Sequence, residues 1–354
     1  MRAAWVASVL AASTGLGAET MRIAVGPEAA VAVIEGPGLA SGDDSDDALF
    51  SPLGKERVTV TLAENRLSVD RTPTLADAVR FRPRGPVSVN GVRVRGDVVV
   101  VKGRSQLQVV NVIPLEEYLV GVLGGEMPAS FPLEALKAQA VAARTYALNK
   151  KLEQYGQLFH LGSSVLSQVY RGLQAEEART RQAVEATRGE VLTWMLQPIE
   201  AYFHASCGGR TESGADALGR ELPYLQPVDC PCGGLPTSRW TLKLGSREMS
   251  ALGAPKGPLE VLGRSRTGRA LKVSVGTRIM DAVTFREKLG YAQLKSLAFD
   301  VEKGREGWVV QGRGFGHGAG LCQWGARVYA EKGWEYRKIL LHYYPGTELQ
   351  VLYE

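Results

Sequence analysis

The chain has 354 residues, 45% hydrophobic and 22% charged, which is ordinary for a soluble globular protein of one large domain or two to three smaller ones. Its formal net charge of +5 favours anionic surroundings, such as an acidic polymer or a membrane surface. The Lys and Arg residues are spread along the chain without a basic block, so composition argues against a nucleic-acid-binding protein.

The first 18 residues have the pattern of a secretory signal peptide. Arg2 precedes an apolar run from Ala3 to Leu16, and residues 16–18 predict cleavage after Ala18. The run is too short and too rich in Ala, Ser and Gly for a membrane span, although an uncleaved anchor or a frayed terminus is the alternative. We therefore expect an exported protein of the periplasm, the cell wall or the medium, with no stable membrane span after signal cleavage.

Residues 19–110 are expected to form a β-rich N-terminal region. Several short, Val-rich segments alternate apolar and polar residues, as half-buried strands do, and Gly, Pro, Asn and Asp separate them. The segments are MRIAVGP, AVAVIEG, RVTVTLA, RLSVD, VRFRP, VSVNGVRVRG, DVVVVKG and LQVVNVI. Asn90-Gly91, between VSV and VRV, predicts a tight hairpin.

One carboxylate, Glu126, stands before a long Ala-rich helix in the segment 114–150. The helix is expected from Leu133 onwards, because apolar residues recur at three- and four-residue steps, and it is apolar on nearly every side, as buried helices are. Glu126 is expected in a turn, Gly124–Pro128, beside apolar surface that would raise the pKa of its carboxyl and suit a general acid. No second carboxylate lies at short range, so the local pattern does not support two-carboxylate glycoside hydrolysis.

Two cations on this helix have two interpretations. Lys137 and Arg144 are seven residues apart and therefore share one stripe of the helix. A buried cation must be paired or must lie on the wall of a pocket. The two residues either line a binding site or serve the structure, by reaching the surface or pairing with carboxylates.

Residues 111–354 are expected to form one catalytic domain, and the whole chain an α+β fold with a mixed sheet around the buried Ala-rich helix. Helices are expected at 176–188, 281–289, 321–332 and 335–342. Strands are expected at 190–194, 199–204, 240–244, 271–275, 296–303 and 307–312. We expect Asp281 to cap one of these helices and Gly290 to end it.

A Cys- and His-rich insertion is expected at about 204–236. His204, Cys207, Cys230 and Cys232 supply four soft ligands within it, a set that tetrahedral zinc takes. The C-x-C spacing is tighter than the usual C-x-x-C, and a disulfide from Cys207 to Cys230 or Cys232 is equally open in an exported protein. Zinc with four protein ligands would be structural.

The Gly-rich stretch 312–320 surrounds His317. Its glycines allow sharp bends that bring His317 close to another group. A dinucleotide site is not expected, because the βαβ unit and the acidic residue that such a site needs are missing. A structural and a functional role for His317 stay equally open.

The residues EEYLVGVLGGEMPASFPLEALKAQAVAARTYAL and GRGFGHGAGLCQWGARVYAEKGWEYRKILLHYYPGTEL resemble the stage II sporulation protein D family, also called the amidase-enhancer (LytB) family. Between them, SQVYRG, AVEATRGEVL and YFHASCGGRTES match further motifs in the same order. The resemblance covers roughly residues 95–354.

The resemblance implies an exported peptidoglycan lytic transglycosylase. It would cleave glycan strands between N-acetylmuramic acid and N-acetylglucosamine, with Glu126 as general acid and then base, and leave 1,6-anhydro ends. The alternative is a non-catalytic protein that binds glycan and activates a cell-wall amidase. The expected substrate-binding residues are Lys137, Gln139, Arg144, Tyr170, His317 and Gln323.

The resemblance also favours zinc over a disulfide, since some relatives bind zinc near the cleft through His and Cys. The implied ligands are His204, Cys207, Cys230 and Cys232. Cys322 departs from the family, because many relatives have Ser or Met there, and it is either a fifth candidate ligand or a free thiol.

Overall fold

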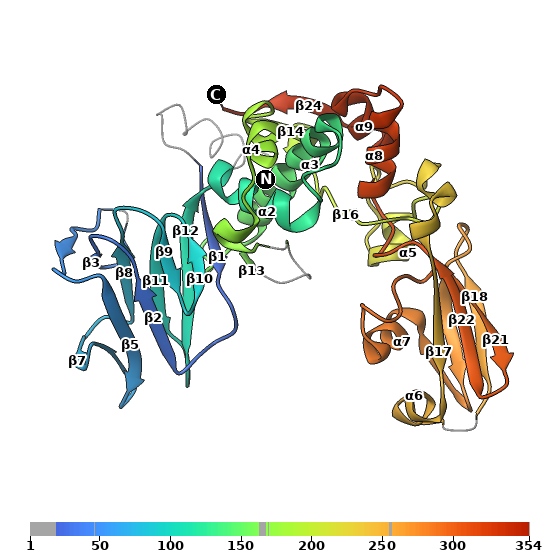
Figure 1. Cartoon of the computed structure of the whole chain (residues 1–354), viewed down its shortest axis with the longest axis horizontal. Helices are drawn as coiled ribbons and strands as arrows, with labels where there is room; N and C mark the ends of the chain where they lie inside the picture. The colour runs from blue at the N-terminus through green and yellow to red at the C-terminus, as the bar shows by residue number, and fades with distance from the viewer. Residues whose placement is uncertain (1–18, 46, 163–167, 169, 255–256, 354) are drawn as a thin grey trace. The chain divides into compact units, whose positions relative to one another are not determined.

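The computed structural model describes residues 19–45, 47–162, 168, 170–254 and 257–353 and confirms an α+β fold. The chain divides into two compact units (Figure 1). The first consists of Met1–Pro128 and Ala147–Glu185, and the second of Ala129–Tyr146 and Ala186–Glu354. The expected division at residue 110 stays a prediction, and the expected signal peptide lies outside the described residues. Among the described residues, no helix is long and apolar enough to cross a membrane.

The first unit contains two sheets that are almost entirely antiparallel. One has the order β13-β1-β12-β11-β8-β3-β4 and the other β10-β9-β2-β5-β6-β7. The strands are β1 (Thr20–Ala24), β2 (Val31–Glu35), β3 (Ala40–Gly42), β4 (Ser51–Pro52), β5 (Arg57–Ala63), β6 (Arg66–Val69), β7 (Thr72–Pro73), β8 (Ala78–Arg82), β9 (Val87–Val89), β10 (Val92–Val94), β11 (Asp97–Lys102), β12 (Leu107–Pro114) and β13 (Leu161–Gly162). All eight predicted β segments are confirmed, and the short strands β3, β4 and β7 were not predicted.

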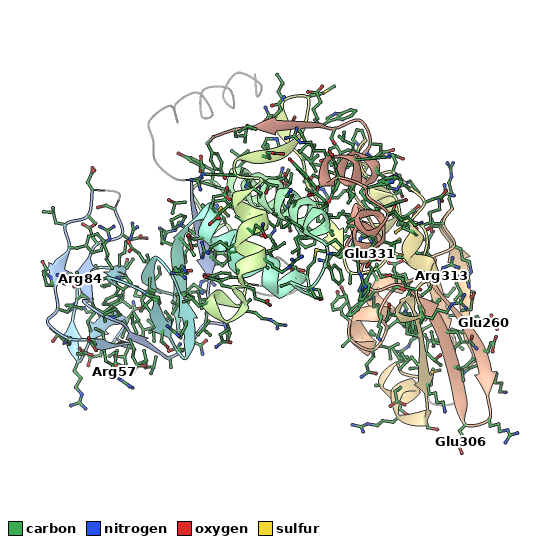
Figure 2. All side chains as sticks on the ribbon, turned by 45° about the horizontal axis from the view of Figure 1, so that its top comes forward. Arg57, Arg84, Glu260, Glu306, Arg313 and Glu331 are labelled. Atoms are coloured by element: carbon green, nitrogen blue, oxygen red, sulfur yellow. The ribbon has the colours of Figure 1, made fainter. Side chains whose placement is uncertain are left out.

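Alternation decides which face of each strand is buried. In β5, for example, Val58 and Val60 are fully buried, whereas Arg57 points into solvent (Figure 2). The predicted hairpin is present, because Val89 pairs with Val92 around Asn90 and Gly91. Both turn residues have positive φ, 48° and 86°, as the tight hairpin turn requires.

Three short helical segments complete the first unit, together with the C-terminal end of the Ala-rich helix α3 (Leu133–Glu153). They are α2 (Leu115–Glu126), the 3-10 helix η1 (Gly172–Ala175) and α4 (Ala178–Glu185). Helix α2 was not predicted. It follows β12 directly, and its buried residues are almost all apolar, so they show no clear helical period.

The second unit begins with most of the Ala-rich helix α3 (Leu133–Glu153). The predicted burial of this helix is confirmed, since all residues from Ala138 to Leu148 are buried. Around it the second unit has the sheet β15-β14-β24, the parallel pair β16-β23, and three helices. Their bounds are β14 (Glu190–Trp194), β15 (Gln197–Pro198), β16 (Phe203–His204), α5 (Gly214–Leu218), β23 (Leu321–Cys322), α8 (Gln323–Glu331), α9 (Tyr336–Tyr343) and β24 (Glu348–Val351).

The strand predicted at 199–204 is wrong over most of its length. Only Phe203–His204 belongs to a strand, because the chain bends twice just before it. The amide of Ala201 donates to the carbonyl of Ile199, and that of Tyr202 donates to Glu200. These tight turns remove the ladder hydrogen bonds that a longer strand would need.

Residues 239–313 contribute two further three-stranded sheets to the second unit, β17-β22-β21 and β18-β19-β20. The elements are the 3-10 helices η2 (Pro231–Gly234) and η3 (Pro236–Ser238) before them, then β17 (Arg239–Leu244), α6 (Ser246–Ala251), β18 (Leu259–Arg264), β19 (Ala270–Val275), β20 (Arg278–Asp281), α7 (Ala282–Leu289), β21 (Phe299–Gly304) and β22 (Gly307–Arg313). A separate apolar core that includes Phe285, Phe299 and Val310 lies between them. The predicted helix at 281–289 is confirmed, with Asp281 and Gly290 at its ends.

Candidate active site and metal centre

Glu126 is the last residue of α2, and the predicted turn at Gly124–Pro128 is therefore wrong in its first half. The helix continues through Gly124, which lies so close to the backbone of η1 that a Cβ there would come within 1.8 Å of the carbonyl oxygen of Ala175. Gly121, one turn earlier on the same face, approaches the carbonyl of Gly172. The two glycines let α2 and η1 pack backbone to backbone, which places the half-buried Glu126 at the end of a closely held helix.

An ionic network also holds α2 within the first unit. Arg181 of α4 binds Glu117 of α2 at 3.1 Å and Glu176 at 3.1 Å. Arg95 binds Glu176 at 2.9 Å. The guanidinium groups are partly exposed, so each contact stabilises the fold only modestly, but together they fix the start of the helix that ends in Glu126.

Tyr170 lies in the interior of the first unit. Only 7% of it is exposed, its hydroxyl donates to Asn111 at 3.1 Å, and its ring packs on that of Tyr118 with centroids 5.1 Å apart. Tyr118 in turn donates to Gln168 at 2.9 Å. Burial raises the pKa of Tyr170, so the phenol stays protonated and acts as a donor.

Arg144 and Lys137 serve the structure of the second unit. Arg144 is fully buried and donates to the carbonyl of Glu190 at 3.1 Å, which ties α3 to the start of β14. Lys137 pairs with Glu134 at 2.8 Å, and its ammonium lies over the ring of Tyr336. Both cations satisfy the structural interpretation of the sequence, and their contacts with a substrate stay a prediction.

The structure brings Gln139 and Gln323 together, although they are 184 residues apart. The side-chain amide of Gln323 donates to that of Gln139 at 3.4 Å, and both residues are buried. The amide nitrogen of Gln139 has no hydrogen-bond partner in the described part of the chain. A buried donor of this kind is costly, which makes this pair a candidate for contact with a ligand.

His317 is held with both ring nitrogens engaged. Its Nε2 donates to the carbonyl of Phe203 at 2.9 Å, and its Nδ1 accepts from the amide of Ala319 at 3.2 Å. Burial lowers the pKa of His317 to about 4, so the ring is neutral near pH 7. The neighbouring Gly316 has φ +115°, and a Cβ there would come within 2.7 Å of the Cβ of His204. The glycines thus let His317 lie close to another group, as predicted. That group is the imidazole of His204, whose ring centroid lies 5.3 Å from that of His317.

All four cysteines of the chain meet in the second unit. The Sγ atoms of Cys207, Cys230, Cys232 and Cys322 lie within 4.8 Å of one another, and all four residues are buried. The 3.4 Å between Cys207 and Cys232 is far longer than a disulfide bond, and the four thiols are free. Cys322 takes the place in this cluster that the sequence suggested for His204, because the Nδ1 of His204 binds the carbonyl of Ala319 at 3.0 Å instead.

This cluster fits a tetrahedral Zn²⁺ site. With zinc–sulfur distances near 2.3 Å, sulfur atoms of such a site lie about 3.8 Å apart, close to the spacing of the four thiols. Backbone amides of Cys207 and Gly325 each donate to the Sγ of Cys322 at 3.3 Å, which favours a thiolate. Burial raises the pKa of Cys207, whereas hydrogen bonds from the other three thiols lower that of Cys232.

A buried ion pair fixes the loop that carries Cys207. Arg269 lies 3.7 Å from Glu212, and both side chains are almost completely buried. The guanidinium of Arg269 also donates to the carbonyls of Cys207 at 2.8 Å and Arg210 at 3.1 Å. The cysteine cluster and this ion pair therefore hold the same loop from two sides.

Comparison with known proteins identifies the family. A sequence model described as stage II sporulation protein matches residues 103–194. The stage II sporulation protein D of Bacillus subtilis is 34% identical over 268 residues, 70% of this chain and 77% of that protein. The chain belongs to the stage II sporulation protein D family.

Other proteins are similar to this chain over different spans. An uncharacterized protein of Brachyspira hyodysenteriae is 32% identical over 89% of this chain and 88% of its own length. The amidase enhancer of Bacillus subtilis is 31% identical over 65% of this chain, but the match covers only 40% of that protein. A domain of unknown function (DUF8618) matches residues 244–320.

The family match covers the whole of α2 and α3, with Glu126, Lys137, Gln139 and Arg144, and it also includes Tyr170. The sequence left Cys322 open as a fifth candidate ligand or a free thiol, and the structure places it with the other three cysteines. Sequence reasoning missed the buried pair of Arg269 and Glu212, for which neither spacing nor periodicity gave a sign.

Proposed function

We propose that this member of the family is an exported lytic transglycosylase that cleaves the glycan strands of peptidoglycan. Membership of the stage II sporulation protein D family supports a cell-wall-related role. The observation that carries the finer proposal is the position of Glu126. It is a half-buried carboxyl at the end of a helix that packs backbone to backbone against η1.

The proposed reaction needs one carboxyl group. Glu126 donates its proton to the glycosidic oxygen, and the bond from this oxygen to C1 of N-acetylmuramic acid breaks. The 6-hydroxyl of the same sugar attacks C1, and the Glu126 carboxylate takes the hydroxyl proton. The products are a 1,6-anhydro end and a free 4-hydroxyl on N-acetylglucosamine, with no water consumed. A second catalytic carboxylate is therefore not required, unlike in hydrolytic glycosidases.

The experiment is to incubate the full mature chain with peptide-stripped glycan strands and to look for anhydro ends by mass spectrometry. Glu126→Gln should lower the rate by at least ~100-fold, because an amide cannot transfer a proton in either step. Glu185→Gln, on the exposed side of α4, is the matched control and should cleave like the wild type. If Glu126→Gln cleaves as fast as this control, Glu126 is not the catalytic acid.

A second candidate function is activation of a separate cell-wall amidase. It is favoured by the similarity to a protein that is named amidase enhancer. In that case the purified chain would produce no anhydro ends, but it would raise the rate at which an added amidase releases peptides from cell walls. Glu126→Gln would keep this effect.

We further propose that Cys207, Cys230, Cys232 and Cys322 hold a structural Zn²⁺. Four thiolate ligands leave no open position for water, so the ion would fasten the loop 205–236 to the start of α8 without taking part in the reaction. We also propose export through residues 1–18. The N-terminal sequence of the secreted protein tests this, and a start at Glu19 is expected.

A further inference from the structure

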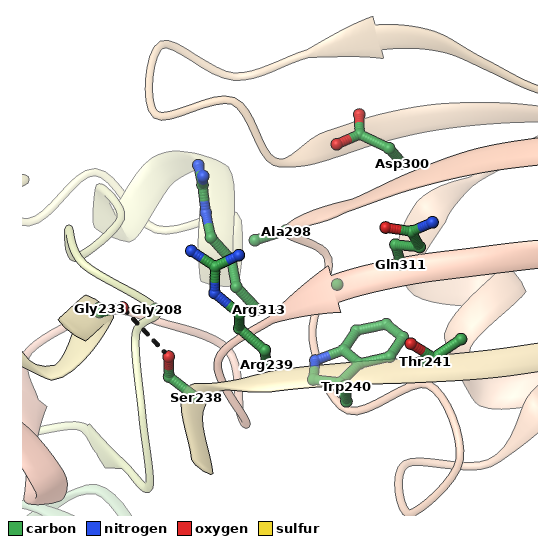
Figure 3. Close-up of a pocket in the computed structure, with 11 residues that line it drawn as sticks. Gly208, Gly233, Ser238, Arg239, Trp240, Thr241, Ala298, Asp300, Gln311 and Arg313 are labelled. Carbon is green, nitrogen blue, oxygen red and sulfur yellow. Dashed lines mark hydrogen bonds between the residues drawn. The ribbon is translucent and has the colours of Figure 1, made fainter. Parts of the chain in front are cut away.

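The exposed face of the sheet β17-β22-β21 carries a pocket with a volume of about 630 Å³ (Figure 3). Five of its lining side chains come from alternate positions of the three strands, which point to solvent: Arg239, Thr241, Asp300, Gln311 and Arg313. Two arginines, Arg239 and Arg313, lie at one end of it, and Thr241, Gln311 and Asp300 lie along it. Nothing in the reaction proposed for Glu126 uses these residues.

The two arginines of the pocket are direct neighbours. Arg239 of β17 is the cross-strand partner of Arg313 of β22, so both side chains leave the same face of the sheet (Figure 3). Like charges in this position destabilise a sheet. Neither guanidinium has an acidic partner among the described residues, and Asp300, the carboxylate of the pocket, binds Arg264 at 2.6 Å. The fold therefore maintains two unneutralised cations that face a cavity.

The row of residues beside the arginines can bind a sugar. Thr241 is paired with Gln311, and Gln311 with Asp300 on the other side. A hydroxyl, an amide and a carboxylate thus follow one another across the three strands. Together they offer both donors and acceptors, which the hydroxyl groups of a sugar need.

Two glycines make room for the walls of the pocket. A Cβ at Gly208, whose φ is +80°, would come within 2.9 Å of the side chain of Arg313. A Cβ at Gly312 would come within 2.1 Å of the ring of Trp240, and the indole of Trp240 donates to the carbonyl of Gly314 at 2.8 Å. A larger residue at Gly208 would displace Arg313, and one at Gly312 would displace the indole of Trp240. The pocket therefore requires glycine at both positions.

We propose that this pocket binds an acidic sugar of a glycan strand, with Arg239 and Arg313 on its carboxylate. Planar guanidinium forks match a carboxylate in two parallel hydrogen bonds, and the row through Gln311 then meets the ring hydroxyls. The choice of polymer rests on the proposed function, which makes peptidoglycan the substrate. In peptide-stripped strands, each N-acetylmuramic acid carries a free lactyl carboxylate that the two arginines can bind. A single-stranded nucleic acid is disfavoured, because the Trp240 indole is only 9% exposed and gives bases no stacking surface.

Binding is measured with the full-length Glu126→Gln variant, so that the strands are not cleaved during the titration. The probes are peptide-stripped glycan strands, the same strands with their carboxylates converted to amides, and neutral N-acetylglucosamine oligomers. The indole N–H signal of Trp240 in an NMR spectrum reports on the pocket itself. We expect stripped strands to shift this signal and to bind about 10- to 100-fold more tightly than amidated strands.

Arg239→Gln and Arg313→Gln should each weaken this binding about 10-fold. High salt should also weaken binding to the wild type, because it screens the attraction between the arginines and the carboxylate. Arg305→Gln is the matched control, since Arg305 is exposed in the turn between β21 and β22 and its loss changes the net charge equally. None of the three exposed substitutions should lower the melting temperature, and loss of either paired arginine should raise it slightly, which separates loss of binding from loss of fold.

Equal binding of stripped and amidated strands, or no effect of either arginine substitution, would overturn the inference. Tighter binding of poly(glycerol phosphate) than of stripped strands would overturn the assignment to a sugar carboxylate. These results are independent of the proposed function: anhydro ends that depend on Glu126 support that function whether or not the pocket binds. A chain without lytic activity can likewise still bind acidic glycan here.

Discussion

The close contact of α2 with η1 can be tested by Gly124→Ala. The added Cβ would lie 1.8 Å from the carbonyl oxygen of Ala175 and 2.9 Å from its carbonyl carbon. Carbon–oxygen contacts normally lie near 3.3 Å, so the two backbones would have to separate by about 1.5 Å. Both partners are main chain, and neither can move aside as a flexible side chain could.

The expected cost is the sum of two opposed effects. Overpacking of this kind costs about 1–3 kcal/mol, and the higher helix propensity of Ala returns up to about 1 kcal/mol. A net loss of about 1–2 kcal/mol should lower Tm by about 2–8 °C. Glu126 lies two residues further along the same helix, and a displacement of about 1 Å at a catalytic group can cost ~100-fold in rate. We therefore expect kcat to fall about 10- to 100-fold.

Thermal unfolding and release of anhydro ends measure the two effects separately. Gly263→Ala is the control, because a Cβ at this position meets no atom within 4 Å. It should change neither quantity. If Gly124→Ala melts like the wild type, the packing of α2 on η1 is not as described; if it melts lower but keeps its kcat, that packing does not position Glu126.

Three further predictions concern other parts of the chain. Cys322→Ser should abolish stoichiometric zinc in metal analysis, whereas His204→Asn should retain it; the reverse pattern would restore the ligand set first expected from the sequence. Burial lowers the pKa of His160 to about 4 in the folded chain, whereas the same imidazole has a pKa near 6.5 in the unfolded chain. Between pH 6.5 and 4, His160 is therefore protonated only in the unfolded chain. Protonation then favours unfolding, so the stability should fall as the pH falls from 6.5 to 4. The loss should be on the order of 1–2 kcal/mol after allowing for partial exposure, and denaturant titrations of His160→Gln should show a flatter pH dependence. Arg144→Met should lower the free energy of unfolding by about 2–3 kcal/mol through the lost bond to Glu190, and unchanged stability would contradict the structural role.

Local patterns predicted the strands and the long helices well. The N-terminal strands alternate with period two and are separated by turn residues, and this information lies within each segment. The burial of α3 was predictable for the same reason, since a helix that is apolar on nearly every side has no solvent face. Helix α2 was missed because its residues are apolar without a clear period, and it ends in glycines that usually break a helix.

The sequence by itself singled out Glu126, His317 and the cysteines as chemically notable, and motif resemblance assigned the family. Only the tertiary structure decided which of them meet. Cys322 reaches the other thiols because β23 pairs with β16 and ends beside the loop of Cys207. Arg239 and Arg313 become partners through the register of two strands that are far apart in the chain. Such contacts depend on the pairing of distant segments, whereas periodicity and turn residues report only on neighbours along the chain.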